Sequence, residues 1–248
     1  MATTRPEPEL PTPPGRKPRR TAPPRQPLTQ EFIVDTAIRV LDAEGLEAVT
    51  MRRVAQELGT GPASLYAHVS GKEELRELML DRVAAEIRLP VPDPERWQEQ
   101  LHELASEIRR VFTSHRDIAM VSMGMVPTGP HLLDVAEAQL ALMRAGGVPK
   151  EIAGIAVDTL GMFLDAGAIE DTIHLTKAPP GADPWEYFQK YIGEVRAYFN
   201  ALPPDRYPVV SGMVDELIAM DGEQRFEFGL GLLVRGIASY VEDEERPG

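Results

Sequence analysis

Positions 49–75 of the chain read VTMRRVAQELGTGPASLYAHVSGKEEL, which predicts short helices separated by tight breaks. We expect one helix from Met51 to Leu58, with Thr50 as its N-cap, because a threonine hydroxyl can accept a hydrogen bond from the free amides of a first turn. Glycines end this helix, and a short helix begins at Pro62, a residue that suits the first helical position. The spacing Ser70-x-x-Glu73 is that of a capping box, which predicts another helix to about Arg88.

Two short helices joined by a glycine-containing turn are typical of a helix-turn-helix. In that motif the second helix enters the major groove of DNA, and the first lies across the backbone. Around the inward Leu65, the short helix presents small or hydrogen-bonding residues: Ala63, Ser64, Tyr66, Ala67 and His68. Such a helix could approach base edges closely. The pattern alone leaves open an ordinary helical hairpin.

On either side of this motif the pattern is helical. Before it, apolar residues recur every three or four positions after Thr29, and Gly45 ends that helix. After it, the proline-rich stretch 89–94 is a break that we interpret as a domain boundary. Further helices are expected at 94–114, 117–124, 128–145, 149–175, 184–201 and 222–243, and no segment alternates with the period of a strand. The predicted class is all-α, with an arm (1–28), a DNA-binding domain (29–90) and a C-terminal helical domain (91–248).

The 248 residues carry a net charge of −13, which at first argues against a nucleic acid partner. The charge is unevenly distributed, because residues 1–28 hold six basic and two acidic side chains while residues 91–248 hold 13 basic and 26 acidic ones. The arm also contains nine of the 23 prolines, so we expect it to be disordered. It is either an arm that follows DNA or a solubilising tail.

Several classes of protein are disfavoured by composition. The chain has no cysteine, which excludes disulfides and thiolate sites and fits a reducing cytoplasm. We find no secretory signal and no stretch that approaches the roughly 20 apolar residues of a membrane span, so we expect a cytoplasmic protein without a membrane partner. We also find no Ser–His–acid order, no metal-ligand spacing and no glycine-rich phosphate loop. An enzyme is therefore not expected.

The stretch 49–59, followed by Leu65-Tyr66-Ala67-His68-Val69 and by Lys72-Glu73-Glu74-Leu75, resembles the N-terminal domain of TetR-family repressors. The resemblance extends over about 29–243, and segments such as 115–117 and 225–230 resemble the tetracycline-repressor branch. It implies a regulator that binds double-stranded operator DNA and responds to a small-molecule effector. The helix pattern and the resemblance together predict these DNA-binding residues: Thr50, Arg52, Ala63, Ser64, Tyr66, His68 and Lys72. Pro62 stands where that branch has a base-reading glutamine, so the operator is expected to differ.

The C-terminal domain is the expected ligand domain, and seven of the ten methionines lie between Met120 and Met220. Methionine suits pockets for varied apolar ligands, although core packing explains any single methionine equally well. Ser122 stands where the tetracycline-repressor branch has a metal-binding histidine, so the resemblance implies no metal, no cofactor and a largely apolar ligand. The predicted ligand-binding residues are Leu104, Ile108, Met120, Met123, Met125, Gln139, Met143, Met162, Phe163, Asp165 and Glu170.

Two helices have apolar stripes suited to a homodimer. In 149–175 Gly154, Gly161 and Ala168 repeat at seven residues, and in 222–243 three glycines do the same. Such spacing favours a four-helix bundle shared by two copies, and packing within one chain is the alternative. We therefore predict a dimeric repressor that a small apolar ligand releases from a palindromic operator. The alternative is an all-α ligand-binding protein or enzyme that does not bind DNA.

Overall fold

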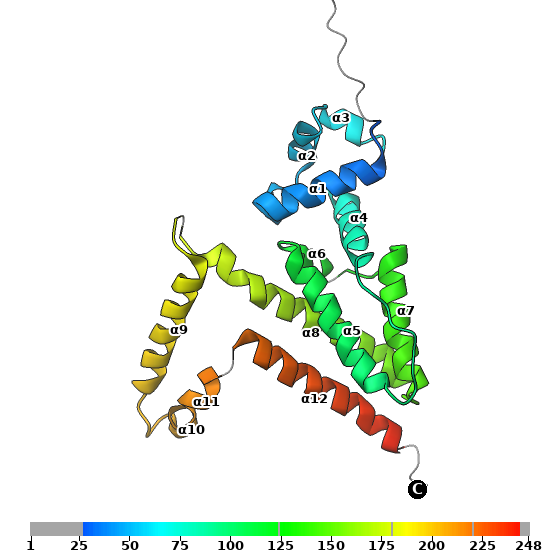
Figure 1. Cartoon of the computed structure of the whole chain (residues 1–248). Helices are drawn as coiled ribbons and strands as arrows, with labels where there is room; N and C mark the ends of the chain where they lie inside the picture. The colour runs from blue at the N-terminus through cyan, green and yellow to red at the C-terminus, as the bar shows by residue number, and fades with distance from the viewer. Residues whose placement is uncertain (1–26, 124, 180, 220, 244–248) are drawn as a thin grey trace, which may run out of the picture.

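The computed structural model describes residues 27–123, 125–179, 181–219 and 221–243 (Figure 1). The predicted N-terminal arm lies outside these residues except for its last two. In the described part the chain forms helices and no strand, which confirms the all-α class. The elements are α1 (Gln30–Glu44), η1 (Leu46–Ala48), α2 (Met51–Glu57), α3 (Pro62–Leu65), α4 (Lys72–Ala84), α5 (Trp97–Ser114), α6 (Ile118–Ser122), α7 (Pro130–Ala145), α8 (Lys150–Lys177), α9 (Pro184–Asn200), α10 (Pro208–Gly212), α11 (Val214–Ala219) and α12 (Gly222–Asp243).

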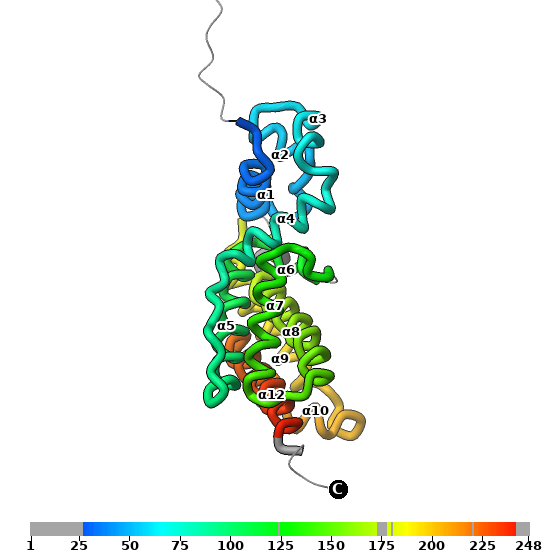
Figure 2. The backbone as a smooth tube through the Cα atoms, turned by 90° about the vertical axis from the view of Figure 1, so that its right-hand side faces the viewer, coloured from blue at the N-terminus to red at the C-terminus, as the bar shows by residue number. Residues whose placement is uncertain are grey.

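Helices α1 to α3 form one end of the molecule in both views (Figures 1 and 2). Their inward side chains are fully buried, as for Ile33, Val54 and Leu65. The hydroxyl of Thr29 accepts from the amide of Phe32 at 3.2 Å, and that of Thr50 accepts from the amide of Arg53 at 3.1 Å. The predicted cap of α2 is therefore confirmed, and Thr29 caps α1 in the same way.

The predicted capping box at Ser70 is wrong in register. The residue that precedes α4 is Gly71, and it makes no side-chain cap. Because α4 begins at Lys72, its third residue is Glu74, and the carboxylate of Glu74 rather than that of Glu73 accepts the amide of Ser70. Only the carboxylate half of a capping box is therefore present, and it reaches the amide of the residue before the N-cap.

Helix α4 connects the two parts of the molecule. It packs against α1 and also against α5, α6 and α7. The linker that follows it is held by Gln100, whose side-chain amide donates to the carbonyl of Val91 at 2.8 Å and accepts the amide of Asp93 at 2.8 Å. The buried core continues from the DNA-binding end into the packing of α5, α7, α8 and α12.

Helix α8 corrects one sequence expectation. Residues 150–172 are, by length and composition, apolar enough to cross a membrane, with a mean hydropathy of 1.6, and a third of that window (33%) is buried inside the chain. Asp158, Asp165 and Glu170 interrupt the apolar run, so the stretch is not continuously apolar. The helix packs against α5, α7 and α12, and a core helix meets the same criteria of length and composition.

Helices α9, α10 and α11 form a separate arm beside the main body (Figure 1). Helix α9 contacts α8 and α11 but contains no buried residue. The short helices α10 and α11 were not expected from the sequence. The six helices that were expected between 94 and 243 have ends within three residues of those predicted.

Candidate DNA-binding face and ligand domain

Helices α2 and α3 and the turn between them form the predicted helix-turn-helix. Gly59 has φ +64°, a left-handed conformation that favours glycine, and the amide of Thr60 donates to the carbonyl of Ala55 at 2.9 Å. These contacts close α2 and direct the chain into α3. Leu65 and Val69 are buried, so the remaining side chains of this segment face outward.

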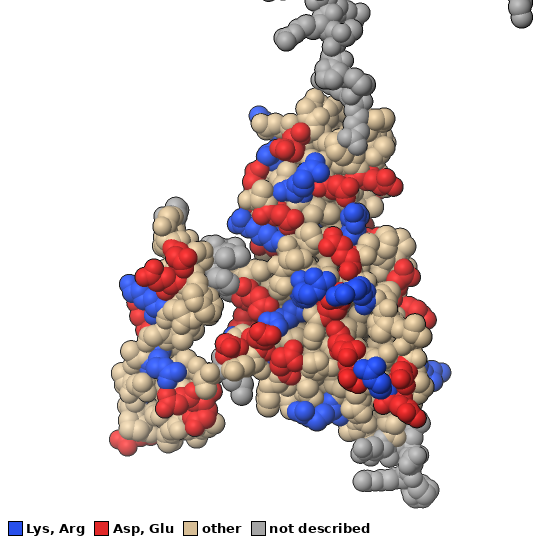
Figure 3. Space-filling view, viewed as in Figure 1, with Lys and Arg blue, Asp and Glu red and all other residues tan. Residues whose placement is uncertain are grey.

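The predicted DNA-binding residues lie together on this end of the molecule. Thr50, Arg52, Ala63, Ser64 and Tyr66 are exposed, with Tyr66 55% exposed, and His68 and Lys72 are half-buried. The hydroxyl of Thr60 donates to that of Ser64 at 3.2 Å, which orients Ser64. In the view of Figure 3 the tip of this end shows few charged side chains, whereas acidic and basic side chains intermingle at its base and over the body below it.

The structure distinguishes two neighbouring arginines. Arg53 forms ion pairs with Glu44 at 2.6 Å and Glu57 at 2.8 Å, and the hydrogen bonds with these carboxylates raise the pKa of Arg53. Arg52 is exposed and forms no ion pair with the described residues. Arg52 is therefore the arginine of α2 that remains available to a phosphate or a base.

Five of the predicted ligand-binding residues are buried where α5, α7 and α8 pack together. They are Leu104 and Ile108 of α5, Gln139 and Met143 of α7, and Asp165 of α8. Burial raises the pKa of Asp165 to about 6, an effect that a hydrogen bond from Ser122 of α6 partly opposes. This carboxyl group therefore changes its charge close to neutral pH.

The other predicted ligand-binding residues lie elsewhere. Met120, Met123 and Met162 are more than half exposed, and Met125 is partly buried against the core. Phe163 stacks on Phe226 with ring centroids 5.2 Å apart, and Glu170 forms an ion pair with Arg225. The structure thus does not bring the whole predicted set into one cavity.

The larger of two adjoining cavities has a volume of about 630 Å³ and lies between α8, the helices α9 and α11, and the start of α12. Its apolar wall comes from α9, with Trp185, Phe188 and Ile192 among its residues, and Glu170 is the one predicted residue that lines it. A smaller cavity of about 270 Å³ adjoins it and includes Phe163 and Glu170.

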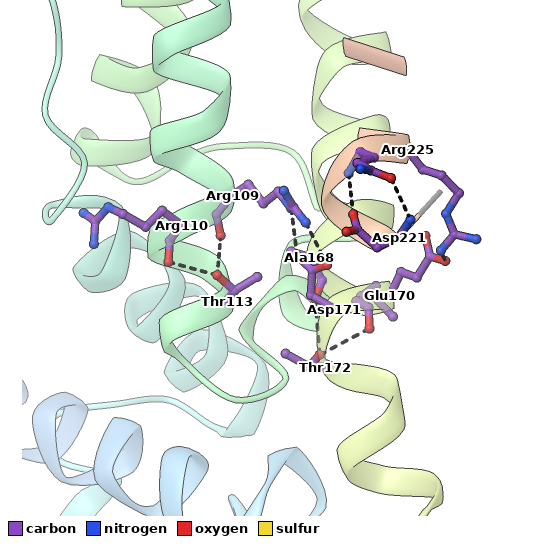
Figure 4. Close-up of polar contacts among 11 residues, drawn as sticks. Arg109, Arg110, Thr113, Ala168, Glu170, Asp171, Thr172, Asp221 and Arg225 are labelled. Carbon is purple, nitrogen blue, oxygen red and sulfur yellow. Dashed lines mark hydrogen bonds and ion pairs between the residues drawn. The ribbon is translucent and has the colours of Figure 1, made fainter. Parts of the chain in front are cut away.

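Polar side chains lie where these two cavities meet (Figure 4). Arg109 of α5 donates from Nε and Nη2 to the two carboxylate oxygens of Asp171 at 2.7 and 2.8 Å, and its guanidinium lies 4.1 Å from the ring centroid of Phe226. Sequence reasoning missed this pair because 62 positions separate its members. The helical spacing of Trp185, Phe188 and Ile192 was a signal that could have indicated the α9 wall.

A groove of about 430 Å³ runs between α8 and α12, where Ile155, Leu232 and Tyr240 are exposed. The glycines that repeat at seven residues in α8 and α12 differ in how closely other atoms approach them. A Cβ at Gly229 would lie 2.8 Å from the ring of Phe163, which reflects close packing within the chain, whereas a Cβ at Gly154, Gly161 or Gly236 would have no atom within 4 Å.

Both parts of the chain match models of known families. Residues 33–79 match the model for bacterial regulatory proteins of the tetR family, and residues 89–241 match the tetracyclin repressor-like C-terminal domain. The chain belongs to the TetR family. The resemblance inferred from the motif around Tyr66 and His68 is therefore confirmed, and this TetR-family chain is a DNA-binding transcriptional regulator.

Similar proteins support the assignment over nearly the whole length. The TetR-family chain is 32% identical over 230 residues to the HTH-type transcriptional repressor DrrR1 of Streptomyces coeruleorubidus. The aligned region covers 92% of this chain and 83% of DrrR1. It is 30% identical to the class D tetracycline repressor protein of Escherichia coli, over 84% of this chain and 88% of that protein. The structure of the Streptomyces coelicolor TetR-family protein ActR in complex with actinorhodin is similar, with a TM-score of 0.78 and 38% identity over 86% of this chain and 96% of ActR.

The described residues of this TetR-family chain contain no group of three or more His, Asp or Glu side chains that could hold a metal ion. Ser122, which stands where the tetracycline-repressor branch is expected to have a metal-binding histidine, hydrogen-bonds to Asp165 through its hydroxyl group.

Proposed function

We propose that this TetR-family chain is a repressor that a small, largely apolar molecule releases from a palindromic operator in the cytoplasm, and that it has no catalytic activity. One observation carries this proposal: α4 joins the exposed face of α2 and α3 to a helical core that contains the buried polar groups of Gln139 and Asp165. A ligand that prefers one arrangement of this core shifts the population of DNA-binding states.

We propose that the two copies of the dimer meet at the groove between α8 and α12. Ile155, Leu232 and Tyr240 expose large apolar surfaces there, and Gly236, which lines the groove and whose Cβ position has no atom within 4 Å, leaves room for a close neighbour. A two-fold pair of these helices makes a four-helix bundle. Such a dimer holds two recognition helices at the spacing of a palindrome, about 34–36 Å.

The direct test is a mobility shift with the DNA fragment upstream of the chain's own gene, at about 100 mM salt because phosphate contacts make the affinity salt-dependent. We expect a shifted band that random DNA of the same length competes for poorly. Absence of binding to the fragment and to other palindromic DNA would refute the proposal. Release of the fragment by tetracycline with Mg²⁺ would contradict the expectation, drawn from Ser122, that the effector binds without a metal.

Lys72 and Ser64 are expected to have different roles. Lys72→Ala removes a cation at the start of α4, so it should weaken binding to the promoter fragment and to random DNA by the same factor and reduce the salt slope by about 1. Ser64→Ala should change the ranking of base variants within the fragment. Lys150→Ala, at the start of α8, is the matched control. Equal effects of both substitutions on specific and random DNA would contradict this division of roles.

A further inference from the structure

The carboxylate of Asp81, on α4, is bound to the first turn of α7. Its Oδ1 accepts the backbone amides of His131 at 2.9 Å and Leu132 at 3.0 Å, and its Oδ2 lies 2.8 Å from Nδ1 of His131. Only 13% of the Asp81 side chain is exposed. A carboxylate normally caps its own helix from a neighbouring position, but this one caps a helix 50 positions away in the sequence.

The start of α7 is shaped around this carboxylate. Gly129 is the N-cap residue and supplies no side-chain cap, and Pro130 follows it without an amide hydrogen. A Cβ at Gly129 would lie 2.2 Å from Oδ1 of Asp81, so the carboxylate occupies the space of that side chain. Gly129 has φ −75° and ψ 150°, which alanine also adopts, so close approach rather than backbone conformation explains the glycine.

Helix α4 connects this contact to the DNA-binding face. Lys72 is its first residue, and Asp81 lies nine residues further along, about 13–14 Å at 1.5 Å per residue. Buried side chains such as Leu75 and Met79 lie between them and fix α4 in the core. A displacement of the first turn of α7 is therefore expected to move α4 as one unit, including its N-terminus at Lys72.

A second contact holds the DNA-binding helices from the other side. Oδ2 of Asp117, just before α6, accepts the amide of Leu46 at 3.0 Å, and the amide of Arg116 donates to Asp42 at 3.2 Å. The chain from residue 116 to residue 132 thus touches α1 and η1 through its beginning and α4 through its end. These two separated polar contacts add to the packing of α4 against α5, α6 and α7 and restrain the orientation of the DNA-binding helices at two points.

We infer that Asp81 is a positioning residue for DNA recognition, which sets the orientation of α1 to α4 by binding them to the first turn of α7. This inference rests on the proposed function, because it concerns how a dimeric repressor holds its two DNA-binding faces. An Asp81 that merely caps α7 would stabilise the chain without affecting the spacing of those faces.

The test measures that spacing directly. Because the chain has no cysteine, Glu47→Cys at the exposed position of η1 places a single spin label on each copy, and pulsed electron paramagnetic resonance gives the distance between the two labels. Three variants act on the contact: Asp81→Ala removes the acceptor, Gly129→Ala displaces the carboxylate, and Asp81→Asn keeps one acceptor oxygen. Asp134→Ala, which removes an exposed carboxylate from α7 itself, is the matched control.

We expect Asp81→Ala and Gly129→Ala each to broaden the distance distribution beyond that of the parent, and the two together to add little. Affinity for the promoter fragment should fall about tenfold if one dimer in ten keeps the competent spacing. Asp81→Asn should restore most of the parental distribution, and Asp134→Ala should leave it unchanged. If Asp81→Ala does not fold, Gly129→Ala gives the same readout with the carboxylate still present.

Parental distances in both Asp81→Ala and Gly129→Ala, with only the melting temperature lowered, would overturn the inference and leave Asp81 as a cap of α7. If the parent chain itself binds no promoter fragment, the proposed function fails instead. The label distances still show in that case whether Asp81 sets the orientation of α1 to α4, because they are measured without DNA.

Discussion

Leu232→Asp is expected to convert the dimer into a monomer and to reduce affinity for the promoter fragment by at least about 100-fold, because an unpaired charge buried in an interface costs about 3 kcal/mol or more. Leu232 is exposed in the groove between α8 and α12, so the single chain can tolerate the carboxylate in water. The substitution therefore acts on association rather than on folding. Light scattering should give the mass of one 27.4 kDa chain instead of two.

The matched control for this experiment is Leu133→Asp in α7. Leu133 is 50% exposed and Leu232 is 51% exposed, so the two substitutions change the surface of the single chain by the same amount. Leu133 does not line the groove. We expect Leu133→Asp to remain dimeric in light scattering, and the control uses that readout alone because Leu133 lies in the first turn of α7. A dimeric Leu232→Asp variant would place the interface elsewhere.

Asp165→Asn is expected to stabilise the chain at pH 7.5 by about 3 kcal/mol and to have no effect on its stability at about pH 4. Burial raises the pKa of Asp165 from 3.8 to about 6, so the folded state favours the protonated carboxyl group. Stability from this group is complete below the unfolded value of 3.8 and is lost as the pH rises through about 6. Asparagine stays neutral at every pH and avoids that loss.

Denaturant unfolding at several pH values tests this prediction, and the quantity to compare is the difference in unfolding free energy between variant and parent. Asp134→Asn, at an exposed position of α7, should show a difference near zero throughout. A constant gain for Asp165→Asn from pH 4 to pH 8 would mean that the gain comes from packing instead of ionisation. No gain at pH 7.5 would mean that the carboxyl group is solvated when charged.

The sequence predicted the local features well because they depend on neighbours in the chain. Helix ends at Thr50 and Gly45 follow from capping chemistry and from a left-handed glycine, and the outward face of α3 follows from the burial of Leu65. The motif around Tyr66 then gave the family. The predicted capping box was wrong by one residue, because the sequence alone does not indicate whether Ser70 or Gly71 is the N-cap of α4.

The features that the sequence did not predict join distant positions. The pairing of Arg109 with Asp171 and that of Asp81 with the start of α7 leave no periodic signal. The ligand set was predicted from residue type and resemblance, and the structure separates the buried Asp165 and Gln139 from the exposed Met120 and Met162. Burial of this kind depends on how α5, α7 and α8 pack, which hydrophobic periodicity does not specify.

Helix α9 has no buried residue in the single chain, and this determines how its backbone should exchange hydrogen with solvent. An isolated helix of 17 residues is only marginally stable in water, so its amides open frequently unless another surface covers them. In the core, Leu104 and Leu160 lie on helices whose amides should exchange only through larger opening events. The rate at which the α9 amide hydrogens exchange therefore reports whether another surface covers this helix. Exchange is slow when a ligand or a second chain packs against α9 and fast when α9 is exposed to water.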